Sequence, residues 1–212
     1  MIGETMFVSG LAMFATAPIA GMLSRKLDPR AMMMIGFAGF SLGTLLMTRM
    51  TADWDFWELF VPQILRGCSM MLAMVPINNV ALGTLPPERI RNASGLYNLS
   101  RNLGGAVGLA LINTMLTRQT RSHFEQLSEH VHWGNPEARD MVTSMTNKFN
   151  ALGLDGSTVA IKKISGIVTQ QAYILSFIDV FLILTFLFAT LVVATVLIQK
   201  PEGMAGASGG GH

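Results

Sequence analysis

The sequence predicts an all-α membrane protein with about five transmembrane helices. Half of its 212 residues are hydrophobic, only 13% are charged, and its mean hydropathy is +0.45. A typical soluble domain carries about 25% charged residues. The apolar residues stand in runs of roughly 18–25, the length that a helix needs to cross the hydrocarbon core of a bilayer. A membrane β-barrel would need alternating segments of about ten residues, and these runs do not alternate.

Each predicted span is bounded by polar or helix-breaking residues. The segment SRKLDPR separates the first span from the second. The segment RMTADWDFWE separates the second from the third, and its Trp54 and Trp57 suit a membrane interface. Pro86 and Pro87 end the third span. The predicted spans are, in order, 6–23, 31–48, 59–85, 95–116 and 171–198.

The segments between and after the spans predict a topology. Residues 1–117 hold four spans, 118–170 form an extracytoplasmic loop, and 199–212 form a disordered, glycine-rich cytoplasmic tail. The loop has apolar residues at helical spacing in TRSHFEQLSEHVHW and ARDMVTSMTNKFNAL, which predicts that it is partly helical. Short loops rich in Lys and Arg are retained in the cytoplasm, which places SRKLDPR, LPPERIRN and the C-terminus on that side.

Several classes of function find no support in the composition. The net charge of +2, without a basic run, argues against nucleic acid as a partner. The single cysteine, Cys68, falls in an apolar run and is predicted to be a buried, inert thiol. His123, His130 and His132 lack the spacing of a metal site and are predicted to be solvated surface residues. Because no nucleophile with a base and no phosphate loop appears, neither an enzyme nor a cofactor is expected.

Two ionisable residues of the predicted spans lie at similar depth. A charged side chain at mid-membrane costs at least about 2.5–3.5 kcal/mol on insertion scales, so such residues mark candidate functional sites. Arg66 and Asp179 each lie about seven or eight residues from the outer end of their span. We predict that they form a buried pair, which would lower the cost of both charges. Asp179 acting as a proton carrier is the alternative interpretation.

Arg101 is the third ionisable candidate, and it shares its helix with asparagines and glycines. Gly104 and Gly108 form a GxxxG pattern, which lets a neighbouring helix approach closely. A polar stripe that includes Arg66 also runs along the third span, either as a wall of a substrate path or as a packing face. The candidate substrate or coupling residues are Arg66, Asn78, Asn79, Asn98, Arg101, Asn102 and Asp179, and the candidate packing residues are Gly104, Gly105 and Gly108.

Three segments resemble a known transporter family. GMLSRKLDPR resembles the cytoplasmic loop signature of the major facilitator superfamily, although Arg25 stands where that pattern has an acidic residue and Asp28 where it has glycine. RNASGLYNLSRNLGGAVGLAL resembles the penultimate helix of the EmrB/QacA family of fourteen-helix drug:proton antiporters, and QQAYILSFIDVF resembles the start of its last helix. The loop-motif residues are Gly21, Leu23, Lys26 and Arg30, together with the divergent Asp28, and the helix-motif residues are Ser94, Gly95, Asn98, Arg101, Asn102, Gly104, Gly105 and Gly108.

The resemblance implies that the five spans are the last five of fourteen, forming most of the C-terminal bundle of a major facilitator fold. It implies proton-driven efflux of lipophilic, often cationic compounds across the cytoplasmic membrane, together with a periplasmic adaptor and an outer-membrane channel in Gram-negative relatives. The expected partners are the lipid bilayer, N-terminal transporter helices that this chain lacks, and lipophilic small molecules. Alone, the chain is expected to be inactive, because transporter sites form between two repeats. The alternatives are a non-transporting scaffold or regulatory subunit, and an exporter of a lipid or siderophore.

Overall fold

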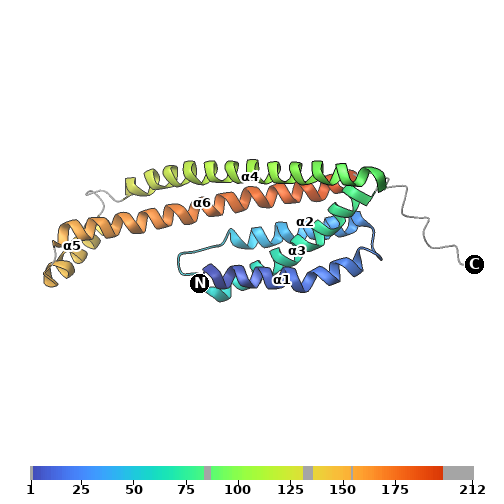
Figure 1. Cartoon of the computed structure of the whole chain (residues 1–212). Coiled ribbons are helices and arrows are strands. Elements are labelled where there is room, and N and C mark those ends of the chain that lie inside the picture. Colours follow the sequence, from blue (N-terminus) through green and yellow to red (C-terminus); the bar gives the residue numbers. More distant parts are fainter. Residues whose placement is uncertain (1, 84–86, 131–135, 154, 198–212) are drawn as a thin grey trace, which may run out of the picture. The chain divides into compact units, whose positions relative to one another are not determined.

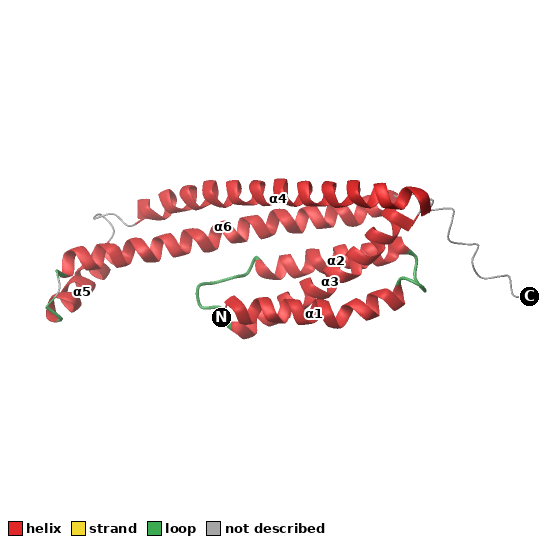
Figure 2. Ribbon diagram, in the orientation of Figure 1, coloured by secondary structure: helices red, strands yellow, loops and turns green. Residues whose placement is uncertain are grey.

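The computed structural model describes residues 2–83, 87–130, 136–153 and 155–197 (Figure 1). These ranges form helices joined by short turns and contain no strand, so the all-α prediction is confirmed (Figure 2). The predicted disordered tail, 199–212, lies outside the described residues. The helices are α1 (Ile2–Leu23), α2 (Pro29–Met47), α3 (Phe56–Gly83), α4 (Pro87–His130), α5 (Pro136–Ala151) and α6 (Gly156–Leu197).

Four of the described helices are long and apolar enough to cross a membrane: α1, α2, α3 and α6. This agrees with four of the five predicted spans. The remaining predicted span, 95–116, lies within α4, which is not among those four. Asn98, Arg101 and Asn102 stand close together in this segment and lower its hydropathy. The crossing of the bilayer by α4 therefore stays a prediction.

The segment predicted as the loop 118–170 is largely helical in the described residues. The helix α4 continues past 116 to His130, α5 follows, and α6 begins at Gly156 rather than at 171. With 44 and 42 residues, α4 and α6 are each about twice as long as a bilayer crossing requires. Part of each helix must therefore lie beyond the hydrocarbon core. The extracytoplasmic location of this part stays a prediction.

The chain divides into two compact units, which are described separately. The first unit contains residues 1–49, 54–108 and 181–212. Within it, α3 packs against both α1 and α2 (Figure 1). Small residues allow this close approach: a Cβ atom on Gly36 of α2 would lie 2.6 Å from the backbone nitrogen of Ala73. Gly67 of α3 is equally crowded, because a Cβ there would lie 2.7 Å from the carbonyl oxygen of Ser9 in α1.

The C-terminal part of α6 packs on α2 within the same unit. The ring of Phe188 lies 4.3 Å from that of Phe40, centroid to centroid. The Thr185 hydroxyl donates to Thr44 Oγ1 at 2.9 Å, and Ser41 Oγ donates to the Thr185 carbonyl at 3.0 Å. Thr44 is fully buried. Hydroxyl groups thus satisfy one another at this contact, as polar groups inside a membrane bundle must.

The second unit contains residues 50–53 and 109–180, and therefore the C-terminal part of α4, the whole of α5 and the N-terminal part of α6. A turn at Leu152 and Gly153 follows α5. Gly153 in this turn has a φ of 75°, a left-handed conformation that glycine adopts without steric cost. The Gly156 backbone nitrogen donates to Asn150 Oδ1 at 3.0 Å, and the α4 and α6 segments are joined by a hydrogen bond from Thr120 Oγ1 to Ser176 Oγ at 3.1 Å.

Candidate functional site

Arg66 is held in the first unit by aromatic rings. Its guanidinium carbon lies 5.5 Å from the ring centroid of Phe40 in α2 and 5.9 Å from that of Phe181 in α6, both within cation–π range. Gly43 of α2 makes room for its aliphatic stem, since a Cβ there would lie 2.8 Å from Arg66 Cγ. The Arg66 Nε atom is buried and has no hydrogen-bond partner among the described residues. The arginine is therefore positioned by packing and ring faces.

Asp179 lies in the second unit and accepts two hydrogen bonds from α4. Its Oδ2 atom is 2.9 Å from Gln119 Nε2 and 2.7 Å from His123 Nε2. The side chains of His123 and Asp179 are 21% and 32% exposed. Two polar residues of one helix therefore converge on a single carboxylate oxygen of the other.

The prediction of a solvated surface histidine holds only in part for His123, which keeps 21% of its side chain exposed but also contacts Asp179. That prediction rested on the missing metal-site spacing of the histidines and on the placement of His123 in the loop 118–170. Because α4 continues as a helix, Gln119 and His123 stand one turn apart on the same face, four positions from each other, and both contact α6. The sequence signal that was missed is this i, i+4 spacing of two polar residues. His132 lies outside the described residues.

The predicted pairing of Arg66 with Asp179 would join the two units. Arg66 belongs to the first unit and Asp179 to the second. The pairing stays a prediction, and it concerns a carboxylate that already accepts hydrogen bonds from His123 and Gln119.

The polar face of α4 around Arg101 is open, as is the apolar side of the same segment, where Leu99 and Leu103 are each 64% exposed. Asn98, Arg101 and Asn102 are all exposed. Cβ atoms placed on Gly104, Gly105 or Gly108 would meet nothing within 4 Å. The described residues thus offer these glycines no packing partner. If the glycines pack against a helix as predicted, that helix is not among the described residues. The described glycines that do pack against another helix in the first unit are Gly36, Gly39, Gly43 and Gly67.

The two asparagines of α3 differ in their surroundings. Asn78 Oδ1 accepts a hydrogen bond of 2.5 Å from the Tyr97 hydroxyl of α4, whereas Asn79 is exposed. Asn78 therefore ties α3 to the start of the α4 polar face, through a tyrosine that the sequence reasoning did not single out.

The predicted loop motif joins α1 to α2. Ser24 Oγ donates to the Gly21 carbonyl at 2.8 Å, and Lys26 is exposed. Asp28 occupies the N-cap position of α2, where a negative charge is favourable to the helix dipole. Arg30 Nε is buried without a hydrogen-bond partner among the described residues.

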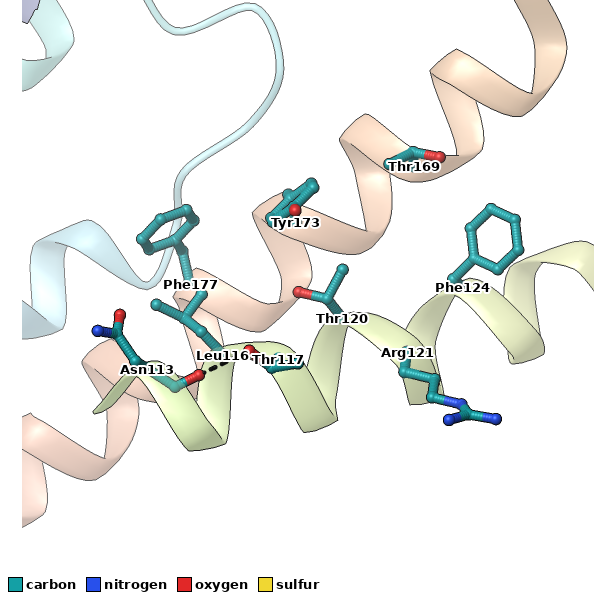
Figure 3. Close-up of a pocket in the computed structure, with 9 residues that line it drawn as sticks. All are labelled: Asn113, Leu116, Thr117, Thr120, Arg121, Phe124, Thr169, Tyr173 and Phe177. Atoms are coloured by element: carbon teal, nitrogen blue, oxygen red, sulfur yellow. Dashed lines mark hydrogen bonds between the residues drawn. The ribbon is translucent and has the colours of Figure 1, made fainter. Parts of the chain in front are cut away.

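Each unit also contains a pocket. In the second unit, a pocket of about 460 Å³ lies between α4 and α6, within the size range of small-molecule sites (Figure 3). In Figure 3, the Arg121 side chain extends away from α6, and it pairs with Glu125 at 3.0 Å. In the first unit, an apolar pocket of about 380 Å³ lies among α2, α3 and α6. The former is lined by Asn113, Leu116, Thr117, Thr120, Arg121, Phe124, Thr169, Tyr173 and Phe177, and the latter by Met33, Phe37, Ile77, Val80, Ala81, Leu191, Ala194 and Thr195.

Comparison with known proteins gives a family match and several relatives. Residues 1–120 match the model of the Major Facilitator Superfamily. The chain is 31% identical to the colistin resistance protein EmrB of Acinetobacter baumannii, over 94% of this chain and 39% of that protein. It is 28% identical to the multidrug export protein EmrB of Escherichia coli K12, over 96% of this chain and 39% of that protein.

A third relative carries a different name. The chain is 26% identical to the fatty acid resistance protein FarB of Neisseria gonorrhoeae, over 92% of this chain and 37% of that protein. The chain thus spans about two fifths of the length of these relatives. No solved structure gives a significant match.

Proposed function

This chain belongs to the major facilitator superfamily, and from that premise we propose that it is the C-terminal part of a proton-coupled multidrug exporter. It is a multi-pass protein of the cytoplasmic membrane. The resemblance to the EmrB/QacA family is confirmed by the likeness to proteins named EmrB. This membership favours a transporter over an enzyme.

The open polar face of α4 is the observation that carries the proposal. Arg101, Asn98 and Asn102 are exposed in a segment that is predicted from the sequence to lie within the bilayer. Charged and amide side chains are costly against lipid and normally face the interior of a bundle or a water-filled path. Gly104 and Gly105 are open on the same helix. A second set of helices, closing a substrate path over this face, would satisfy all of these groups.

Lipophilic or amphipathic compounds are the proposed substrates. Relatives are named for multidrug export, colistin resistance and fatty acid resistance. The apolar pocket of the first unit, lined by Met33 and Phe37 among others, is of a kind that accommodates varied apolar ligands. An assembly with a periplasmic adaptor and an outer-membrane channel is proposed on the family resemblance.

Export of fatty acids or other lipids is the second candidate. The name of the FarB relative favours it. An assay with both a lipophilic cationic dye and a medium-chain fatty acid would separate the two. Export of the dye supports multidrug transport, and export of the fatty acid alone supports the second candidate.

The test of the main proposal compares two proteins in inverted membrane vesicles. One is this chain alone, and the other is this chain joined to the helices encoded upstream in its reading frame. We expect proton-driven dye transport from the joined protein only, because one incomplete repeat cannot alternate access. Proton-dependent transport by the chain alone, or an upstream frame that encodes no further spans, would contradict the proposal.

A further inference from the structure

We propose that His123 and Asp179 form a proton-binding pair whose protonation tightens the contact between α4 and α6. The proposal rests on the proposed function for its role in transport, but the pair itself can be tested without transport. It stands on the geometry of the second unit, where His123 Nε2 lies 2.7 Å from Asp179 Oδ2.

The geometry suits a charge-assisted hydrogen bond. A separation of 2.7 Å is at the short end of the range for hydrogen bonds that involve an ionised group. Gln119 Nε2 donates to the same oxygen at 2.9 Å, which fixes the carboxylate in place. With Nε2 of His123 committed to Asp179, the other ring nitrogen, Nδ1, is where a proton is gained or lost.

Few other ionisable groups of the two helix segments compete for this role. Within three turns of the pair, α6 contributes only Tyr173 besides Asp179. On α4, the ionisable neighbours are Arg118, Arg121, Glu125, Glu129 and a second histidine, His130, two turns further along the helix. Arg121 and Glu125 pair with each other and are 83% and 63% exposed. His123 is therefore the ionisable residue of α4 whose contact with Asp179 the structure describes.

The proton step is simple. In the neutral state, the His123 Nε2–H group donates to the Asp179 carboxylate. A proton from water adds to Nδ1 and produces an imidazolium–carboxylate pair, and its release restores the neutral ring. Histidine is the side chain whose charge ordinarily changes between pH 5 and 8. The exposed fractions of 21% and 32% leave both side chains accessible to water.

The pair is one residue away from the wall of the 460 Å³ pocket. Thr120 follows Gln119 in α4, lines the pocket and donates to Ser176 Oγ at 3.1 Å. Ser176 is buried and stands one turn before Asp179 in α6. Phe124, which follows His123, lines the same pocket. Closer approach of α4 and α6 at the pair therefore changes the walls of the pocket, which is how a proton at the pair would act on a bound ligand.

The first test measures the thermal stability of the purified chain at the two ends of the range from pH 5 to 8. Because proton binding creates an ion pair between two helices, we expect a higher Tm at the acidic end. His123→Gln keeps a hydrogen-bond donor for Asp179 but cannot take a second proton, so this pH-dependent difference should disappear. Glu125→Gln, which neutralises an exposed carboxylate two residues further along α4, should retain it.

A double-mutant cycle makes the test specific to the pair. The double variant His123→Gln with Asp179→Asn should show the same Tm difference between the two pH values as His123→Gln alone, because either substitution by itself removes the ion pair. If Asp179→Asn does not give folded protein, the comparison of His123→Gln with Glu125→Gln still decides. A pH-dependent Tm difference in His123→Gln that equals the wild-type value would overturn the proposal.

The second test places His123→Gln in the full-length transporter. We expect ligand exchange without a proton gradient to continue, and acceleration of export by the gradient to be lost. Full proton-driven export by His123→Gln would overturn the coupling role of the pair. If the wild-type transporter exports nothing, the proposed function fails, whereas the stability test still decides whether the pair binds a proton.

Discussion

Gly36 of α2 lies directly against the backbone of Ala73 in α3, so that a Cβ atom on Gly36 would be 2.6 Å from the Ala73 nitrogen and 2.9 Å from its Cα. Backbone atoms cannot move aside as the end of a flexible side chain can. The contact between α2 and α3 therefore depends on the absence of a side chain at position 36.

The first prediction follows from this contact. Gly36→Ala should lower the stability of the chain by about 1–3 kcal/mol, the usual cost of overpacking. Gly104→Ala is the matched control, because a Cβ at Gly104 meets nothing within 4 Å. Alanine is also favoured over glycine within a helix, by up to about 1 kcal/mol. Thermal unfolding in detergent measures both variants, and equal Tm values for the two would contradict the described packing.

The second prediction concerns the orientation of the chain in the membrane. Among the contacts described, the Ser24 hydroxyl donates to the Gly21 carbonyl at 2.8 Å, and the Ser128 hydroxyl donates to the Phe124 carbonyl at 2.6 Å. Both contacts are local, so cysteine should be tolerated at either position. In a Cys68→Ser background, a membrane-impermeant thiol reagent applied to intact cells should label Ser128→Cys and leave Ser24→Cys unlabelled. Labelling of Ser24→Cys from outside would reverse the predicted topology.

The third prediction tests the proposed pairing of Arg66 with Asp179. If the two pair, either neutral substitution alone leaves an uncompensated charge, at a cost of roughly 3–5 kcal/mol. The double variant Arg66→Gln with Asp179→Asn should then be recovered from membranes at a higher level than either single variant. Quantitative immunoblotting of the membrane fraction measures this. If the loss of membrane abundance in the double variant equals the sum of the losses in the two single variants, contact between these residues is contradicted.

The fourth prediction concerns Arg101 in the full-length transporter. Lysine retains the charge and can extend equally well toward the interface, but it lacks the planar, multi-donor group of arginine. Arg101→Lys should therefore insert at the wild-type level yet lose most export activity. Membrane abundance and dye efflux, measured on the same cells, separate the two effects. Wild-type efflux by Arg101→Lys would instead favour a role in anchoring the helix at the interface.

The fifth prediction concerns Asp155, which precedes α6. Hydrogen bonds from the side chains of Thr158 and Ser157, with the backbone of Thr158, hold the pKa of the Asp155 carboxyl below its usual value. Because the pKa of Asp155 is lower in the folded than in the unfolded protein, its ionised carboxylate stabilises the fold at pH values above the pKa of the unfolded state. This stabilisation is lost as the pH falls through the pKa of the folded state. Thr158→Val should raise the pKa of Asp155 in a carboxyl carbon NMR titration. An unchanged titration would show that the Thr158 hydroxyl does not stabilise the ionised form.

Several features of this protein could be determined from the sequence alone, because they depend on local properties of the chain. The length of an apolar run decides whether a helix can cross a bilayer, and α1, α2, α3 and α6 were predicted in this way. The motif around Arg101 pointed to the transporter family, to which the match over residues 1–120 also leads. The rarity of ionisable residues in such runs was sufficient to single out Arg66 and Asp179 as candidates.

Contacts between helices were decided only by the tertiary structure. Glycines occur in both α2 and α4, yet those of α2 pack against a neighbour whereas Gly104 and Gly105 are open. Asp179 was noticed in the sequence, but its partner His123, 56 positions away, was assigned to solvent. Helical periodicity shows which residues share a face of one helix, but it does not show which face meets another helix. That choice depends on the fit of side chains from distant parts of the chain, and it is the fit of α4 against α6 that brings the imidazole to the carboxylate.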